Sequence, residues 1–219
     1  MRGRAFLLLL ILVAGCVEKP GDTTRTADSA RPSAPAPQDR RFDVRSGIFE
    51  RVTKIANETG TREDRHRVYF DEYGGRVIWF TEARMPNDTA RTALMLDRGE
   101  LLSFSPESGD RVPIGPAAEN RRLIPAFLDP ETTSRMRLGY GYTMEEIGQE
   151  DILGRPAIGY RWTSPQAGTI EEWVWNRISL RFQAPGVSDE VTRLETDIPI
   201  PAEKFRSVTR EDLARELAF

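Results

Sequence analysis

Hydrophobic and polar residues alternate with a period of two over most of the chain from Gly47 onward. The clearest run is 177–182, in which Ile178, Leu180 and Phe182 share one face and two arginines and a serine take the other. Such alternation is typical of strands with one buried face. Further strands are predicted at 48–56, 65–70, 76–83, 90–96, 101–104, 145–154, 156–163 and 171–176.

Short turn motifs separate these predicted strands. They include Tyr73-Gly74-Gly75, Asp97-Arg98-Gly99 and Ala184-Pro185-Gly186. Glycine and proline favour tight turns, and strands joined by tight turns run antiparallel. Because no long helical pattern intervenes, the sequence predicts an antiparallel meander of the mainly β (α+β) class.

Two parts of the chain depart from the strand pattern. The segment 117–128 has partial helical spacing, and a short helical turn is expected at 131–138. Near the end, the segment 209–212 resembles a capping box, with aspartate in place of glutamate, and Leu213 and Leu217 then share a helical face. The sequence therefore predicts short helices beside the sheet and a short C-terminal helix docked on it.

The first sixteen residues follow a different pattern. Arg2 and Arg4 precede an apolar run from Phe6 to Val13, and small residues then lead to Cys16. Basic, apolar and small residues in this order form a secretory signal. The alternative is a transmembrane helix, but the run is shorter than the roughly 20 apolar residues that cross a bilayer.

The segment Val13-Ala14-Gly15-Cys16 resembles the lipobox of bacterial lipoproteins. The resemblance implies cleavage of the signal peptide 1–15 and acylation of Cys16, with palmitate as a typical acyl chain. In enteric lipoproteins an aspartate after the lipidated cysteine retains the protein at the inner membrane. Val17 in that place implies an outer-membrane anchor that faces the periplasm, if the organism has two membranes.

The segment 17–41 contains four prolines, no aromatic residue and no aliphatic residue larger than valine. Such a segment cannot bury enough apolar surface to offset the entropy lost on ordering. We therefore expect the signal peptide at 1–15, the lipidated cysteine and a disordered tether at 16–41, and a single domain at 42–219.

Charge and composition argue against several classes of function. The formal net charge is −3, and an acidic surface disfavours a nucleic-acid partner. Cys16 is the one cysteine, which leaves no residue for a disulfide, a thiolate nucleophile or a cysteine metal site. The one histidine, His66, is expected at the surface or rim of the sheet. Because neither a cysteine ligand nor a second histidine is present, no transition-metal site is predicted, and no cofactor is expected.

The C-terminal half has an order of motifs that points to a known family. The motifs are Asp151 to Ala157, the strand with Tyr160 and Trp162, Glu172-Trp173-Val174-Trp175, Ile178 to Phe182, and Ile198 to Pro201 followed by Phe205. This order resembles the outer-membrane lipoprotein carrier-like (LolA/LolB-like) superfamily over residues 145–206, whereas 47–145 shares only the strand rhythm. The resemblance implies a half-barrel, a curved antiparallel sheet with helices over its concave face. In some members that face holds acyl chains.

Aromatic and aliphatic side chains of this half are candidates for a ligand-binding wall, because they bury large areas without a charge. The alternative is ordinary core between sheet and helix. The candidate residues are Trp162, Trp173, Trp175, Ile178, Leu180 and Phe182.

No catalytic residue is predicted. Adjacent carboxylates such as Glu171 and Glu172 point to opposite faces of a strand, so they cannot act on one bond, and we expect them in solvent. The expected function is that of a non-catalytic, membrane-anchored monomer that binds a lipid, a lipopeptide or another hydrophobic ligand. The alternative is an envelope module for protein interaction or assembly, with a closed core.

Overall fold

The computed structural model describes residues 40–58, 60–85, 88–105, 107–120, 123–124 and 130–218. They belong to a compact unit that comprises 34–219. The predicted signal peptide, Cys16 and the tether up to residue 39 lie outside the described residues, so these assignments stay predictions.

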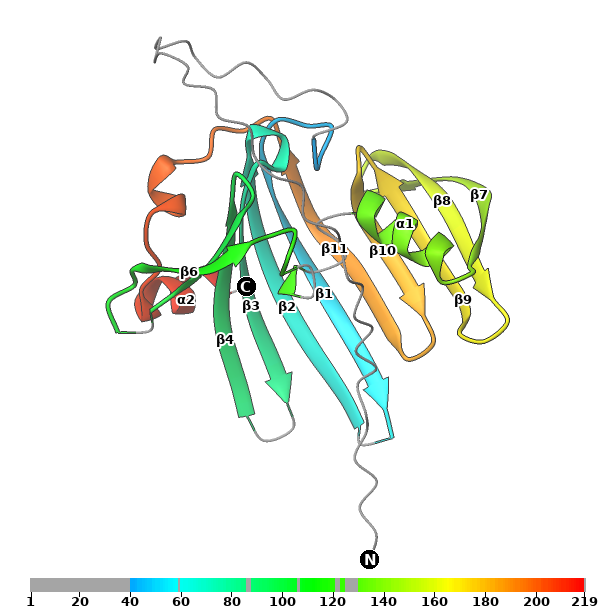
Figure 1. Cartoon of the computed structure of the whole chain (residues 1–219), viewed down its shortest axis with the longest axis horizontal. Coiled ribbons are helices and arrows are strands. Elements are labelled where there is room, and N and C mark those ends of the chain that lie inside the picture. The colour runs from blue at the N-terminus through cyan, green and yellow to red at the C-terminus, as the bar shows by residue number, and fades with distance from the viewer. Residues whose placement is uncertain are drawn as a thin grey trace, which may run out of the picture. The chain divides into compact units, whose positions relative to one another are not determined.

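Within the described residues, eleven antiparallel strands form one curved, unclosed sheet in the order β6-β5-β4-β3-β2-β1-β11-β10-β9-β8-β7 (Figure 1). The predicted mainly β half-barrel is thus confirmed. The pair β1–β11 joins two meanders, β1–β6 and β7–β11. The strands are β1 (Gly47–Asn57), β2 (Gly60–Asp71), β3 (Arg76–Met85), β4 (Asp88–Asp97), β5 (Glu100–Phe104), β6 (Arg111–Pro116), β7 (Thr143–Ile152), β8 (Arg155–Ser164), β9 (Gly168–Trp175), β10 (Ile178–Ala184) and β11 (Val187–Thr196).

The sequence did not predict β6 and β11. In β11 the charged Asp189 faces the same side as Val191 and is only 5% exposed. The register with β1 also shifts between Glu50 and Arg51, which marks a bulge. A buried charge and a bulge together disrupt the period-two pattern, and so this strand was not recognised.

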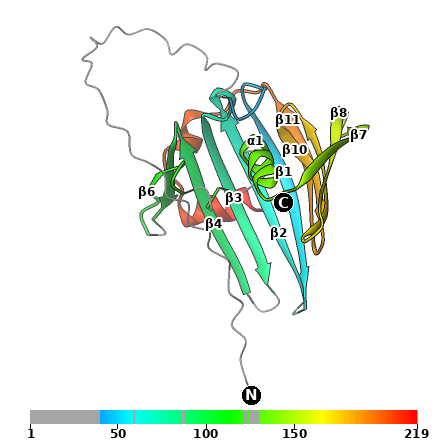
Figure 2. The same cartoon turned by 45° about the vertical axis from the view of Figure 1, so that its right-hand side comes forward.

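We call the face of the sheet that carries Arg51 and Asp189 the inner face, and the opposite one the outer face. Helix α1 (Pro130–Gly139) covers the inner face and confirms the helical turn predicted at 131–138 (Figure 2). Of the helix predicted at 117–128, residues 117–119 form a turn, whereas 121–122 and 125–128 lie outside the described residues.

Aromatic side chains fill part of the inner face. Phe42, just before β1, is fully buried, and its ring lies 4.7 Å from the ring of Phe70 and 6.3 Å from that of Phe49. The backbone N–H of Phe42 also donates to the carbonyl of Tyr73 at 3.1 Å. This part of the concavity is therefore closed by the side chains of the chain itself.

The C-terminal segment covers the outer face, on the side of the sheet opposite α1 (Figures 1 and 2). It comprises the short helices η5 (Ala202–Phe205) and α2 (Arg210–Glu216). The predicted capping box is confirmed, because the Thr209 hydroxyl accepts from the Asp212 N–H at 3.1 Å and the Asp212 carboxylate accepts from the Thr209 N–H at 2.9 Å. Leu217 is buried against the sheet, and Leu213 packs beside it.

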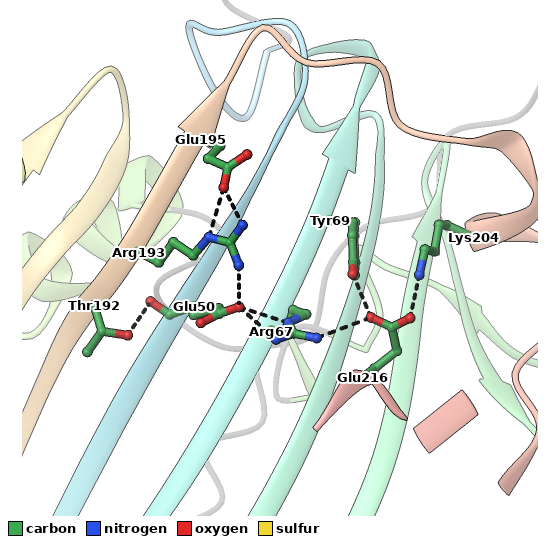
Figure 3. A network of polar contacts seen from close by, with 8 residues as sticks. All are labelled: Glu50, Arg67, Tyr69, Thr192, Arg193, Glu195, Lys204 and Glu216. Carbon is green, nitrogen blue, oxygen red and sulfur yellow. Dashed lines mark hydrogen bonds and ion pairs between the residues drawn. The ribbon is translucent and has the colours of Figure 1, made fainter. Parts of the chain in front are cut away.

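A polar network also holds α2 on the outer face (Figure 3). The carboxylate of Glu216, which is 3% exposed, accepts from the Tyr69 hydroxyl at 2.5 Å and from Lys204. Arg67 lies 3.6 Å from the same carboxylate and donates to Glu50 at 2.8 Å. Burial alone would raise the pKa of Glu216, but the hydrogen bonds from Lys204 and Tyr69 hold that pKa below its ordinary value.

Candidate functional site

A cavity of about 270 Å³ lies on the inner face, beside α1. Strands of both meanders contribute to its walls, since β1, β2, β9, β10 and β11 all supply side chains. It is lined by Arg51, Thr53, Asp64, His66, Arg137, Glu172, Ser179, Phe182, Val187 and Asp189.

Arg51 and Asp189 form a buried ion pair in one wall of the cavity. Arg51 Nε donates to Asp189 Oδ1 at 2.8 Å, and the Thr53 hydroxyl donates to the same oxygen at 2.7 Å. Arg51 is fully buried. Burial lowers the pKa of Arg51 to about 9, and the nearby carboxylate of Glu172 opposes that shift. The guanidinium is therefore a cation at neutral pH.

His66 extends this polar chain across β1, β2 and β3. Its Nε2 lies 3.3 Å from the Thr53 hydroxyl and its Nδ1 lies 3.0 Å from the Thr81 hydroxyl. Because Thr53 gives its single proton to Asp189, Nε2 carries the imidazole hydrogen and Nδ1 accepts from Thr81. Burial and the charges of Arg51 and Arg62 lower the pKa of His66 to about 3, so the ring is neutral.

The predicted surface or rim position of His66 is therefore wrong, because this side chain is only 8% exposed. Alternation correctly separates His66 from its neighbours Arg65 and Arg67. Alternation could not indicate how deeply His66 is buried. On the inner face this side chain contacts the polar side chains of Thr53 and Thr81 instead of solvent.

A second buried ion pair connects α1 to the sheet. Arg137 Nη1 donates to Glu172 Oε2 at 2.6 Å, and the two residues are 8% and 5% exposed. The Arg137 guanidinium also lies 5.2 Å from the ring of Trp162 and 5.5 Å from that of Phe182. The solvated position predicted for Glu172 is wrong. Glu171 does point to the opposite face, where it accepts from Arg161 at 2.9 Å.

Ser179 differs from the other polar residues of the cavity wall. It is 1% exposed, and its hydroxyl has no hydrogen-bond partner within the part of the chain that the structure describes. The same holds for Nε1 of Trp162, which is 2% exposed. A buried polar group without a partner costs about 1–3 kcal/mol.

The structure distributes the six predicted ligand-binding residues over two faces. Trp162 and Phe182 lie on the inner face, where both approach Arg137. Trp173 pairs with Arg181 and Trp175 with Ile178 in the register of β9 and β10, so both lie on the side of β9 opposite Glu172, and both pack against the main core. The Arg181 guanidinium lies 5.3 Å from the ring of Trp173.

A β-bulge changes the faces along β10. Phe182 pairs with Glu172, but the register shifts between Ser179 and Arg181. Ile178 and Phe182 consequently lie on opposite faces, and the prediction that Ile178, Leu180 and Phe182 share one face is wrong. Ile178 and Leu180 are fully buried in the main core.

Sequence reasoning missed Arg51, Arg137, Ser179 and Asp189. For Arg51 a signal was present, since it follows the apolar Phe49 at a spacing of two and thus occupies a core-facing position. Among the described residues, no group of histidine, cysteine, aspartate and glutamate side chains could hold a metal ion. No helix in the described ranges is long and apolar enough to span a membrane.

No family model matches the chain, and no curated protein matches its sequence. Solved structures of similar fold include the Pseudomonas aeruginosa MucA/MucB complex, at 16% identity and TM-score 0.49 over 77% of this chain and 59% of that chain. A LolA superfamily protein from Nitrosomonas europaea is 12% identical, with TM-score 0.40 over 78% of this chain and 94% of its own. An outer membrane lipoprotein-sorting protein domain from Vibrio parahaemolyticus is 12% identical, with TM-score 0.32 over 74% and 89%. The match with the MucA/MucB structure spans less than two thirds of the MucB chain. All three similarities concern the fold alone.

Proposed function

We propose that the chain is a non-catalytic extracytoplasmic lipoprotein, anchored through acylated Cys16, that binds an amphipathic ligand in the inner-face cavity. The signal pattern and the lipobox of the first sixteen residues support the anchor. The cavity beside α1 supports the binding role.

The observation that carries this proposal is the hydroxyl of Ser179. It lines the cavity, is almost fully buried and has no partner among the described residues. A ligand with a hydrogen-bonding head group would remove this cost on binding. The cations Arg51 and Arg137, each beside a carboxylate, add a polar environment for the same head group.

Phe182 and Val187 give the cavity an apolar part. A methylene group transferred there from water contributes about 0.8 kcal/mol, so even part of an acyl chain adds measurable affinity. Trp162, behind Arg137 on the same face, would sense the ligand without forming the cavity wall. This arrangement favours a molecule with one polar end and a short apolar part.

The test uses a monoacyl phospholipid below its critical micelle concentration, with binding measured by calorimetry. Ser179→Ala should weaken binding by about tenfold, because one hydrogen bond is lost, yet raise the melting temperature of the free protein. Ser188→Ala, on an exposed residue of β11, is the matched control and should change neither. Absence of binding by the unmodified protein would contradict the proposal.

A second candidate function, an envelope interaction module, is favoured by exposed apolar side chains on and next to α1. Met136, Leu138, Tyr140 and Met144 are 48–58% exposed. Under this alternative, Leu138→Glu would abolish capture of an envelope protein, and the monoacyl phospholipid would not bind the unmodified protein.

A further inference from the structure

The strand β4 has a long unpaired edge. It pairs with β3 from Asp88 to Asp97, but with β5 only from Met95 to Asp97. Among the described residues, no strand pairs with 88–94 on the β5 side. In Figure 1 this part of β4 is the left-hand edge of the sheet.

A tight hairpin determines which backbone groups point out from this edge. The pair Asp97–Glu100 closes the two-residue loop between β4 and β5. In such a hairpin the closing pair is hydrogen-bonded, so Asp97 bonds on the β5 side, and bonded positions alternate along the strand. The N–H and C=O groups of residues 89, 91 and 93 therefore point outward.

Two of these positions offer both a donor and an acceptor. The N–H of Thr89 donates to the side chain of Asp88 at 2.7 Å and is already used. No described residue pairs with the outward groups of Arg91 and Ala93. An added strand could therefore form backbone hydrogen bonds at these two positions.

A groove of about 750 Å³ runs beside this edge. Its apolar side chains come from β4, β5 and the C-terminal segment. It is lined by Thr89, Arg91, Thr92, Ala93, Leu94, Ser103, Phe104, Ser105, Val208, Arg210, Leu213 and Ala214. Every second side chain of an added strand would point into this groove.

The opposite edge of the sheet, β7, has features that prevent strand addition. It carries the exposed carboxylates Glu145, Glu146 and Asp151, and its register shifts between Glu146 and Gly148. Charges and bulges of this kind protect edge strands from pairing. The β4 edge has neither a bulge nor an acidic residue between Thr89 and Ala93.

We propose that the β4 edge binds an extended, acidic peptide segment of a partner protein by strand addition. The charge of the groove selects the partner, because both charged residues that line it, Arg91 and Arg210, are arginines. Among the described residues, the carboxylate paired with Arg91 is that of Glu82, which also pairs with Arg84. This site is separate from the inner-face cavity and does not depend on a lipid ligand.

The experiment uses the mature protein and a short capped peptide of alternating valine and glutamate, with binding measured by calorimetry. A peptide methylated on every second backbone nitrogen, on the edge that would pair with β4, should bind at least about tenfold more weakly, because methylation removes strand hydrogen bonds. A valine–lysine peptide of the same length should also bind more weakly. Equal affinity for the methylated and unmethylated peptides would overturn strand addition.

A variant pair locates the site. Ala93→Pro removes an outward N–H, and proline is tolerated on edge strands, so this variant should fold and lose the peptide. Gln149→Pro at the β7 edge is the matched control and should retain peptide binding. If the unmodified protein instead forms a dimer and Ala93→Pro is a monomer, the edge binds a second copy of the chain and the proposed occupant is wrong.

Discussion

Arg51 and Asp189 meet across the β1–β11 pair, with Arg51 Nε 2.8 Å from Asp189 Oδ1. This strand pair joins the two meanders of the sheet. The ion pair is almost completely excluded from solvent, so neither charge can be solvated if its partner is lost. The junction of the sheet and the wall of the candidate cavity thus depend on the same two side chains.

Removal of one partner of this pair should be strongly destabilising. We expect Asp189→Leu to lower the free energy of unfolding by about 3–5 kcal/mol, because Arg51 stays buried without its carboxylate. The double variant Arg51→Met/Asp189→Leu should lose less than the sum of the two single losses. Urea denaturation of Arg51→Met, Asp189→Leu and the double variant measures the three losses.

The matched control for this cycle is Arg135→Met, which removes an exposed ion pair with Glu131. Its expected cost is below about 1 kcal/mol. A loss for Asp189→Leu no larger than that of the control would show that the buried pair is not what holds the junction.

Stability should depend on pH through His66. The pKa of His66 is lowered to about 3 in the folded chain, so between that value and the ordinary 6.5 the unfolded chain binds the extra proton. Stability from this residue is therefore lost as the pH falls below 6.5. Between pH 7 and pH 5 we expect a loss of about 2 kcal/mol that is absent in His66→Gln. Urea denaturation of both proteins at the two pH values tests this difference, and identical pH profiles would contradict it.

The sequence predicted the fold better than it predicted the site. Alternation placed nine strands, and the capping box at Thr209 and Asp212 located α2, because these signals are local. The strand β11 was missed, since Asp189 occupies a core-facing position and a bulge interrupts the period. Pairing between β1 and β11 depends on residues far apart in the chain, which no local pattern encodes.

The candidate site was harder to predict because its residues depart from the usual preference for apolar side chains inside. Glu172 is a carboxylate next to another carboxylate, and only the position of Arg137 on α1 explains its burial. The bulge in β10 then separates Ile178 from Phe182, which strict alternation had placed together. Trp173 packs over Gly159, where an added Cβ would lie 3.0 Å from the indole nitrogen.

The network around Glu216 should control the docking of α2. We expect Glu216→Gln to cost about 1–3 kcal/mol, because Lys204 and Tyr69 lose a charged acceptor. Since the pKa of Glu216 is lowered in the folded chain, this stabilisation is present above the ordinary pKa of the carboxyl and is lost as the pH falls through the lowered value. Hydrogen exchange of the α2 amides should accelerate in this variant. Glu211→Gln, at an exposed position of the same helix, should leave the exchange unchanged.

The anchor is tested by Cys16→Ser. Without the thiol, acylation cannot occur, so the protein should leave the membrane fraction and appear in the soluble fraction. Metabolic labelling with a palmitate analogue should mark the unmodified protein and not the variant. If Cys16→Ser still fractionates as an integral membrane protein, the signal segment remains attached and the lipoprotein assignment is wrong.

Binding of a ligand on the inner face beside α1 can be tested directly through the tryptophan side chains. The indole N–H signals of the four tryptophans can be followed by NMR during titration with a monoacyl phospholipid. Trp162 lies on the inner face next to Arg137, and its Nε1 has no partner among the described residues. Trp173 and Trp175 lie on the side of β9 opposite Glu172, packed against the main core. We expect a saturable shift of the Trp162 signal while the signals of Trp173 and Trp175 stay in place. A shift of the Trp173 and Trp175 signals alone, or of none, would contradict binding at this face.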